Sequence, residues 1–194
     1  IRLPAPRLGE HTSEVLADAE DSVRVDDAGF SLSKARRPLE GIRVLDLTWV
    51  WAGPFGTMNL AHLGAEVIRM ESSVRPDLYR RGGNSNNPEA ELSLNRSGMF
   101  NQNNQGKKSL AVDFSTPQGV EIVKQFVAKS DVVVENFATG VMARLGLGYP
   151  DLKRVNPRIV VASISGYGQT GPYREYMSYG PAIPPLSGIS SVTG

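Results

Sequence analysis

The sequence predicts an α/β fold with a Rossmann-like, mostly parallel sheet of at least five strands flanked by helices. From residue 39 onward, short apolar segments alternate with longer amphipathic ones, which is typical of βαβ units with right-handed crossovers. One short segment, DVVVEN at 131–136, is apolar along most of its length, as expected for a strand that is covered on both faces.

The elements follow one another in a regular order. A first helix is expected within HTSEVLADAE at 11–20, with Thr12 or Ser13 as its N-cap. Strands are expected at 42–47, 66–70, 109–114, 131–136 and 158–164, and further helices at 54–63, 115–130, 139–145 and 150–155. The helix at 115–130 is expected to have Ser115 or Thr116 as its N-cap and Pro117 in its first turn. The polar residues 72–106 are expected to form a long surface loop. The glycine-rich residues 165–188 form a second loop, of the type that often carries function.

Composition excludes several classes of function. The 194 residues include no cysteine, so disulfides, thiolate metal sites and a cysteine nucleophile are excluded. With only two histidines we expect no metal site, and the near balance of 21 basic and 20 acidic residues gives no reason to expect a nucleic-acid partner. No apolar run is long enough to span a membrane, and the N-terminus has no signal-peptide core. We therefore expect a cytoplasmic protein.

Candidate binding residues follow the strands, because ligands of open parallel sheets collect at the carboxyl ends. After the first strand, Gly53 allows close backbone approach, and the helix that starts at Pro54 would favour an anion. Trp49 and Trp51 would share one face if the strand continued, and they could hold a flat ring or pack in the core. The turn lacks the three spaced glycines of a dinucleotide site, which disfavours an NAD enzyme.

The later strand ends offer further candidates. Phe114 is expected to be core, and Asn136 can bind a polar ligand, whereas Glu135 is expected to be solvated. Arg144 could pair with a phosphate, and Lys107–Lys108 is expected to be a solvated pair. No catalytic triad, nucleophile elbow or P-loop is present. The residues alone therefore predict a ligand-binding α/β domain.

Several blocks of the sequence resemble one known family. PLEGIRVLDLTWVWAGPFGTMNLAHLGAEVIRME closely resembles the start of the class III CoA-transferases, the CaiB/BaiF family, which includes formyl-CoA transferases and acyl-CoA racemases. The likeness continues in NQGKKSLAVDFSTPQGVEIVKQFVAKSDVVVENFATGVMARLGLGYPDL, NPRIVVASISGYGQTGPY and LSGISSVTG, and covers nearly all of 38–194. It implies the large domain of that family, which takes coenzyme A or acyl-CoA as substrate and holds no prosthetic group.

The resemblance also implies which residues contact CoA. Carried over by position, they are Trp51, Ala52, Ser72, Val112, Asp113, Phe114, Ser115, Asn136, Phe137, Ala138, Arg144, Met177, Ser178, Tyr179 and Gly180. Ser72 stands where formyl-CoA-transferase-like members have a basic residue, and Ala138 where an arginine is common. Gly180 stands where many members have an acidic residue.

The family's nucleophile is an aspartate shortly after the SG…TG segment, and it reacts through an anhydride and an aspartyl-CoA thioester. The chain ends at Gly194, before that motif, so we name no catalytic residue. Related racemases have a histidine where Tyr179 stands, which favours CoA transfer over racemisation. A non-catalytic CoA-binding or scaffold half remains the main alternative.

The first residues resemble a different part of the family. PAPRLGEHTSEVLAD resembles the family's C-terminal tail. This predicts residues 1–19 as the tail of a preceding CoA-transferase-like domain, 20–38 as a linker, and 39–194 as an incomplete N-terminal CoA-binding part of a second domain. Because family members form interlocked dimers, the expected partners besides acyl-CoA and an acceptor acid are a second copy or the tandem domain of the same chain.

Overall fold

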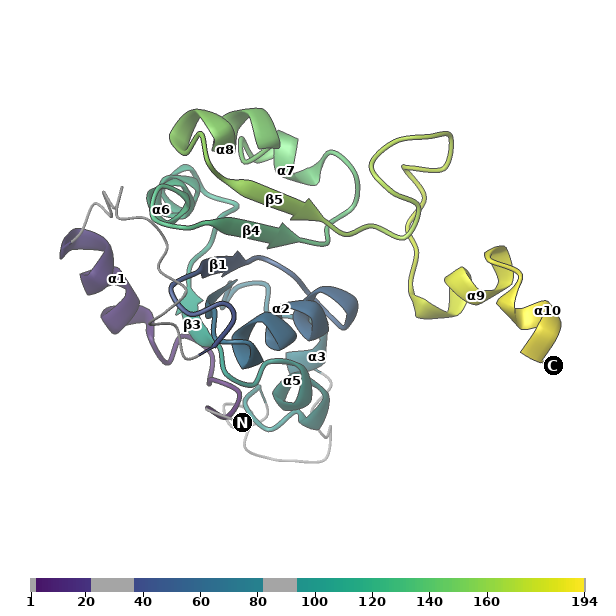
Figure 1. Cartoon of the computed structure of the whole chain (residues 1–194), viewed down its shortest axis with the longest axis horizontal. Coiled ribbons are helices and arrows are strands. Elements are labelled where there is room, and N and C mark those ends of the chain that lie inside the picture. The colour runs from purple at the N-terminus through teal and green to yellow at the C-terminus, as the bar shows by residue number, and fades with distance from the viewer. Residues whose placement is uncertain (1–2, 22–36, 82–93, 194) are drawn as a thin grey trace.

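The protein is built around a five-stranded, all-parallel sheet (Figure 1). The computed structural model describes residues 3–21, 37–81 and 94–193. The strands lie in the order β3-β2-β1-β4-β5, and their bounds are β1 Arg43–Asp46, β2 Glu66–Glu71, β3 Lys108–Ala111, β4 Val132–Glu135 and β5 Val160–Ser163. The predicted α/β class and the predicted number of strands are therefore confirmed.

Helices cover both faces of the sheet. On one face lies α2 (Ala52–His62), whose Ala61 packs with Val44 and Val67 of the strands. On the other face lie α6 (Pro117–Val127) and α8 (Tyr149–Val155), which share a larger apolar core with Leu45 and Ile68. The remaining described helices are α1 Thr12–Asp21, α3 Leu78–Arg81, α5 Gly98–Asn103, α7 Val141–Arg144, η1 Gly180–Ala182, α9 Ile183–Leu186 and α10 Ile189–Thr193.

The start of α6 follows the predicted capping chemistry. The Thr116 hydroxyl accepts a hydrogen bond from the Gly119 N–H at 3.1 Å, and a proline stands in the first turn. Thr116, rather than Ser115, is therefore the N-cap.

The N-terminal segment packs against the edge strand β3. The His11 N–H donates to the Ser109 carbonyl at 3.1 Å, and the Ala111 N–H donates to the Thr12 hydroxyl at 3.1 Å. Val15 of α1 is buried in the larger core. Residues 3–21 thus cover an edge of the sheet that would otherwise expose unpaired backbone groups.

Two loop predictions need correction. Residues 72–106 contain α3 and α5, and Phe100 of α5 is fully buried, so the described part of this stretch is packed structure and not a surface loop. Its polar composition was misleading because the buried polar side chains here have partners: Asp77 pairs with Arg69 of β2, and Arg80 pairs with Glu71 of β2. The second predicted loop, residues 165–188, is not a loop throughout, because it contains η1 and α9. Together with α10 they lie in a segment after β5 that extends away from the sheet (Figure 1).

None of the helices in the described ranges is long and apolar enough to cross a lipid bilayer.

Candidate functional site

The turn between β1 and α2 is held in a strained shape. Val50 has φ of 68°, which is an outlier for a β-branched residue. β1 ends at Asp46, before Trp49, so the condition under which Trp49 and Trp51 would share one face is not met. Trp51 is 58% exposed, whereas Trp49 is half-buried. A Cβ on Gly53 would lie 2.4 Å from the Cβ of Thr48, so this close approach requires glycine.

Asn136 joins this turn to the end of β4. Its side-chain oxygen accepts from the Trp49 N–H at 2.7 Å, and its amide donates to the Trp49 carbonyl at 2.8 Å. The residue was predicted to bind a polar ligand, but its oxygen and its amide nitrogen both bond to the backbone of Trp49. Asn136 therefore fixes the turn.

Beneath the turn lies a cluster of six buried charges, which we call the charge cluster. Each member is at most 2% exposed, and the three acids and three bases balance: Asp46, Glu71, Asp77, Arg69, Arg80 and Lys107. Buried charges are tolerated only when they are paired and hydrogen-bonded. The cluster meets this condition closely, because the Arg69 Nε is the only buried side-chain polar atom of the described residues without a hydrogen bond.

Lys107 and Asp46 form one half of the cluster. The Lys107 ammonium donates to the Asp46 carboxylate at 2.9 Å, the Pro54 carbonyl at 3.0 Å and the Asn104 side chain at 2.8 Å. Burial lowers the pKa of Lys107 to about 8. Burial alone would raise the pKa of Asp46, but the charges of Lys107 and Arg69 outweigh it and lower this pKa to about 2. Both groups are therefore charged at neutral pH, and the expectation that Lys107 would be solvated is wrong.

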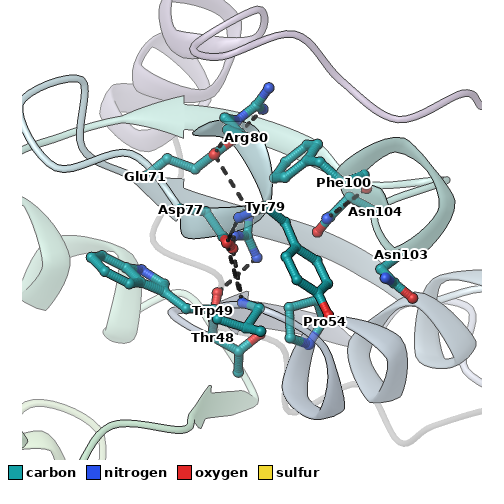
Figure 2. Close-up of polar contacts among 12 residues, drawn as sticks. Thr48, Trp49, Pro54, Glu71, Asp77, Tyr79, Arg80, Phe100, Asn103 and Asn104 are labelled. Atoms are coloured by element: carbon teal, nitrogen blue, oxygen red, sulfur yellow. Dashed lines mark hydrogen bonds and ion pairs between the residues drawn. The ribbon is translucent and has the colours of Figure 1, made fainter. Parts of the chain in front are cut away.

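Arg69 and Asp77 form the part of the cluster nearest the turn. One Arg69 nitrogen donates to the Thr48 carbonyl at 2.8 Å and another to Asp77 at 2.5 Å. The Asp77 carboxylate also accepts from the Val50 N–H, at 3.1 Å to the nearer oxygen. Figure 2 shows Asp77 beside Thr48 and Trp49.

Glu71 and Arg80 complete the charge cluster. Arg80 donates twice to the Glu71 carboxylate, at 2.6 and 2.7 Å, and once to the Pro6 carbonyl at 3.1 Å. The Phe100 ring covers the guanidinium at 3.6 Å from the ring centroid, as Figure 2 shows. Every carboxylate of the charge cluster already accepts hydrogen bonds from neighbouring groups. The cluster therefore gives no reason to expect a catalytic base.

Three aromatic rings connect the carboxyl ends of β1, β4 and β3. The rings of Trp49 and Phe137 lie 5.9 Å apart edge to face, and those of Phe137 and Phe114 lie 6.2 Å apart. Phe114 and Val112 are buried in the larger core, which agrees with the core interpretation of Phe114. Glu135 is buried and accepts from the Phe137 N–H at 2.8 Å, so the expectation that it would be solvated is wrong.

The candidates after β2 and β3 form small local turns. Ser72 is buried, and its hydroxyl accepts from the N–H groups of Val74 and Arg75, both at 3.2 Å. Asp113 accepts from the Ser115 hydroxyl at 2.7 Å, and this hydrogen bond lowers the pKa of Asp113. Ser115 is exposed at the start of α6.

The remaining candidates are mostly exposed. Ala52 and Ala138 lie at the surface, and the Arg144 guanidinium folds back to within 3.2 Å of where a Cβ on Gly140 would stand. The Thr139 hydroxyl donates to the Arg174 carbonyl at 2.8 Å, which ties the end of β4 to the loop after β5.

That loop carries the last four candidates. Ser178 is half-buried against Gly166, where an added Cβ would lie 2.2 Å from the Cβ of Ser178. Met177, Tyr179 and Gly180 are exposed. The structure thus joins the candidates of β1, β3 and β4 directly through the rings, and links those of the last loop to the same end of the sheet.

Sequence reasoning missed the charge cluster. A signal was present, since Asp46 and Arg69 interrupt apolar runs inside segments predicted as strands, and Glu71 directly follows the second of these segments. Asp46 and Arg69 are direct partners in the register of β1 and β2, but the register becomes visible only in the structure.

Comparisons with known proteins agree with this fold. A family model described as CoA-transferase family III matches residues 39–194. A mouse succinyl-CoA:glutarate CoA-transferase is 44% identical over 158 residues, which are 81% of this chain and 35% of that protein. The alpha subunit of a succinyl-CoA–L-malate CoA-transferase from Chloroflexus aurantiacus is 36% identical over 97% of this chain and 43% of its own length.

A solved structure of a CaiB/BaiF family protein from Brucella suis is similar in fold, with a TM-score of 0.70 and 37% identity. The similarity covers 81% of this chain and 41% of that one. The chain thus spans less than half the length of these relatives.

Proposed function

Since the chain belongs to CoA-transferase family III, we propose that the protein moves CoA from an acyl-CoA to a free carboxylic acid. The observation that carries this proposal is the family match over residues 39–194, which includes the whole described sheet. The named relatives use succinyl-CoA and different acids. We do not extend either acid to this protein, because the resemblance places the acyl pocket in a second domain.

The proposed chemistry is acyl transfer through an aspartate that follows residue 194. Its carboxylate attacks the thioester carbonyl, which forms a mixed anhydride and releases the CoA thiolate. The thiolate then attacks the aspartyl carbonyl, giving an aspartyl-CoA thioester and the free first acid. A second carboxylate repeats the two steps in reverse and leaves as its CoA thioester. No step needs a prosthetic group.

Within this chain the proposed role is CoA binding at the carboxyl ends of the strands. Trp51 and Ala52 are exposed where α2 begins, and Trp51, its N-cap, forms no side-chain capping bond. In this proposal the backbone N–H groups of Ala52 and Gly53 favour a ligand anion, whereas Pro54 has no N–H to donate. Ser115 is exposed and directly precedes Thr116, the N-cap of α6. Ser72, Val112 and Phe114 are buried, and in this proposal they shape the walls of the site.

Arg144 gives the sharpest test of the binding site. Arg144→Ala in the full-length protein should weaken CoA binding by about 1.5–3 kcal/mol, because a hydrogen bond from a charged group to a phosphate is lost. Arg158→Ala is the matched control, since Arg158 is an exposed arginine just before β5, at the amino end of the sheet. Isothermal titration with CoA measures both. An unchanged dissociation constant for Arg144→Ala removes this residue from the site, and no CoA binding by the wild type refutes the proposal itself.

A non-catalytic CoA-binding half is the second candidate, because Ala138 and Gly180 depart from the family pattern. Sequencing the native polypeptide beyond residue 194 separates the two, since the transferase needs an aspartate there.

The proposed domain division, with 1–19 as the tail of a preceding domain, is tested by the intact mass. The Chloroflexus match over 97% of the chain favours an alternative in which residues 1–38 are an N-terminal arm of one domain. A tandem chain could pair its two domains internally, whereas a single domain would need a second copy. A cytosolic location stays a prediction.

A further inference from the structure

We call residues 47–54, which run from the end of β1 through the first residues of α2, the β1–α2 turn, and buried charged side chains bind its backbone at three points. Arg69 donates to the Thr48 carbonyl at 2.8 Å, and Lys107 donates to the Pro54 carbonyl at 3.0 Å. Asp77 accepts from the Val50 N–H at 3.1 Å. All three side chains are less than 3% exposed. The polar backbone groups of the turn are therefore held from beneath, while Trp51 stays exposed.

One of these three contacts, from the Val50 N–H to Asp77, lies at the strained residue of the turn. Val50 adopts φ of 68°, which a β-branched side chain disfavours, and such a conformation persists only where its surroundings impose it. The Asp77 carboxylate binds the Val50 N–H, and Arg69 fixes the same carboxylate at 2.5 Å. The shape of the turn thus depends on an ion pair that lies outside it.

We propose that Asp77, Arg69 and Lys107 are positioning residues that set the shape of the β1–α2 turn, and through it the place of Trp51 and Ala52 in the CoA site. The identity of the ligand in this inference rests on the proposed function. The effect of the three residues on the shape of the turn does not. None of the three residues is proposed to touch CoA.

A buried arginine at the other end of β1 provides the comparison. Arg43 is 3% exposed and is paired with Glu66 and Asp18, each at 2.7 Å. It stands at the amino end of the sheet, and its side chain donates to Glu66 and Asp18, at the opposite end of β1 from the turn. Arg43→Met therefore removes the ion pairs of a buried arginine, whose partners Asp18 and Glu66 are 53% and 31% exposed, and leaves the contacts of the turn in place.

The experiment compares Asp77→Asn, Arg69→Met and Arg43→Met in the full-length protein labelled with 5-fluorotryptophan. Asparagine keeps an acceptor for the Val50 N–H, but it loses the ion pair with Arg69. The ¹⁹F resonances of Trp49 and Trp51, assigned by Trp→Phe variants, report the shape of the turn without any ligand. Titration with CoA reports binding, and urea unfolding reports stability.

We expect Asp77→Asn and Arg69→Met to shift both resonances and to raise the dissociation constant for CoA about tenfold, since a charged hydrogen bond that orders the turn is lost. Arg43→Met should lower stability without either change. If Arg69→Met does not fold, Asp77→Asn decides alone.

Two results overturn the inference. One is unshifted resonances in Asp77→Asn, and the other is the same shifts in Arg43→Met, which would make them a consequence of lost stability. Failure of the proposed function gives a different result, because wild-type protein would then show no CoA binding while the resonances still respond to Asp77→Asn.

Discussion

Replacing Lys107 with methionine removes one positive charge from the interior of the protein. Methionine fills a similar volume, so the cavity left is small. The ammonium's three hydrogen bonds are lost, and among the described residues the Asp46 carboxylate keeps only Arg69 as a nearby cation, with its nitrogen at 3.7 Å. Removing one partner of a buried ion pair costs about 3–5 kcal/mol, because the other charge stays buried and uncompensated. We expect a loss of this size in the free energy of unfolding.

The neighbouring lysine is the control for this substitution. Lys108 is 29% exposed and pairs with Glu14 and Glu66, and ion pairs of this kind contribute less than about 1 kcal/mol. Urea denaturation of Lys107→Met and Lys108→Met in the full-length protein, followed by circular dichroism, measures both. The argument from burial is refuted if Lys107→Met destabilises the protein no more than Lys108→Met.

Two further predictions concern the same end of the sheet. Gly53→Ala should lower the free energy of unfolding by about 1–3 kcal/mol because the new methyl group would overlap Thr48. Gly56→Ala, in the same helix and with no heavy atom within 4 Å of its added Cβ, should instead raise it by about 0.5–1 kcal/mol; equal effects in urea denaturation would contradict this. The pKa of Asp46 is lowered in the folded protein to about 2. The contribution of the Asp46 carboxylate to the free energy of unfolding is therefore complete above its unfolded pKa near 4 and is lost as the pH falls towards 2. This loss amounts to about 2 kcal/mol, and Asp46→Asn should not show it.

The fold was predictable because its signals are local. The apolar segments at 42–47 and 131–136 each contain the strand observed there, and β2 extends only one residue beyond the predicted 66–70, since a strand covered on both faces needs apolar side chains in both directions. Thr116 and Pro117 marked the start of α6 through capping chemistry, which depends on only four neighbouring residues. Strand ends were displaced by one to three residues, because the last residues of a predicted strand already turn towards the following loop.

The charge cluster was not predictable because its pairs are distant in sequence. Lys107 and Asp46 are 61 residues apart, and nothing in the local sequence KKS distinguishes Lys107 from Lys108. The two differ because successive side chains near the edge strand β3 point in opposite directions. Lys107 lies beneath the turn, and Lys108 lies next to α1. Only the register of β1, β2 and β3 places opposite charges together.

Stability alone does not explain why six charges are buried. Apolar side chains of similar volume often stabilise a core as well as a buried ion pair does. Apolar groups cannot, however, bind the backbone. Arg69, Asp77 and Lys107 bind three polar groups of the turn, and Arg80 binds the carbonyl of Pro6 in the N-terminal segment. These contacts fix one strained conformation at the carboxyl end of the sheet, which a set of apolar contacts would leave free to relax. The cluster therefore fits a role in holding the β1–α2 turn in place more closely than a role in the stability of the sheet.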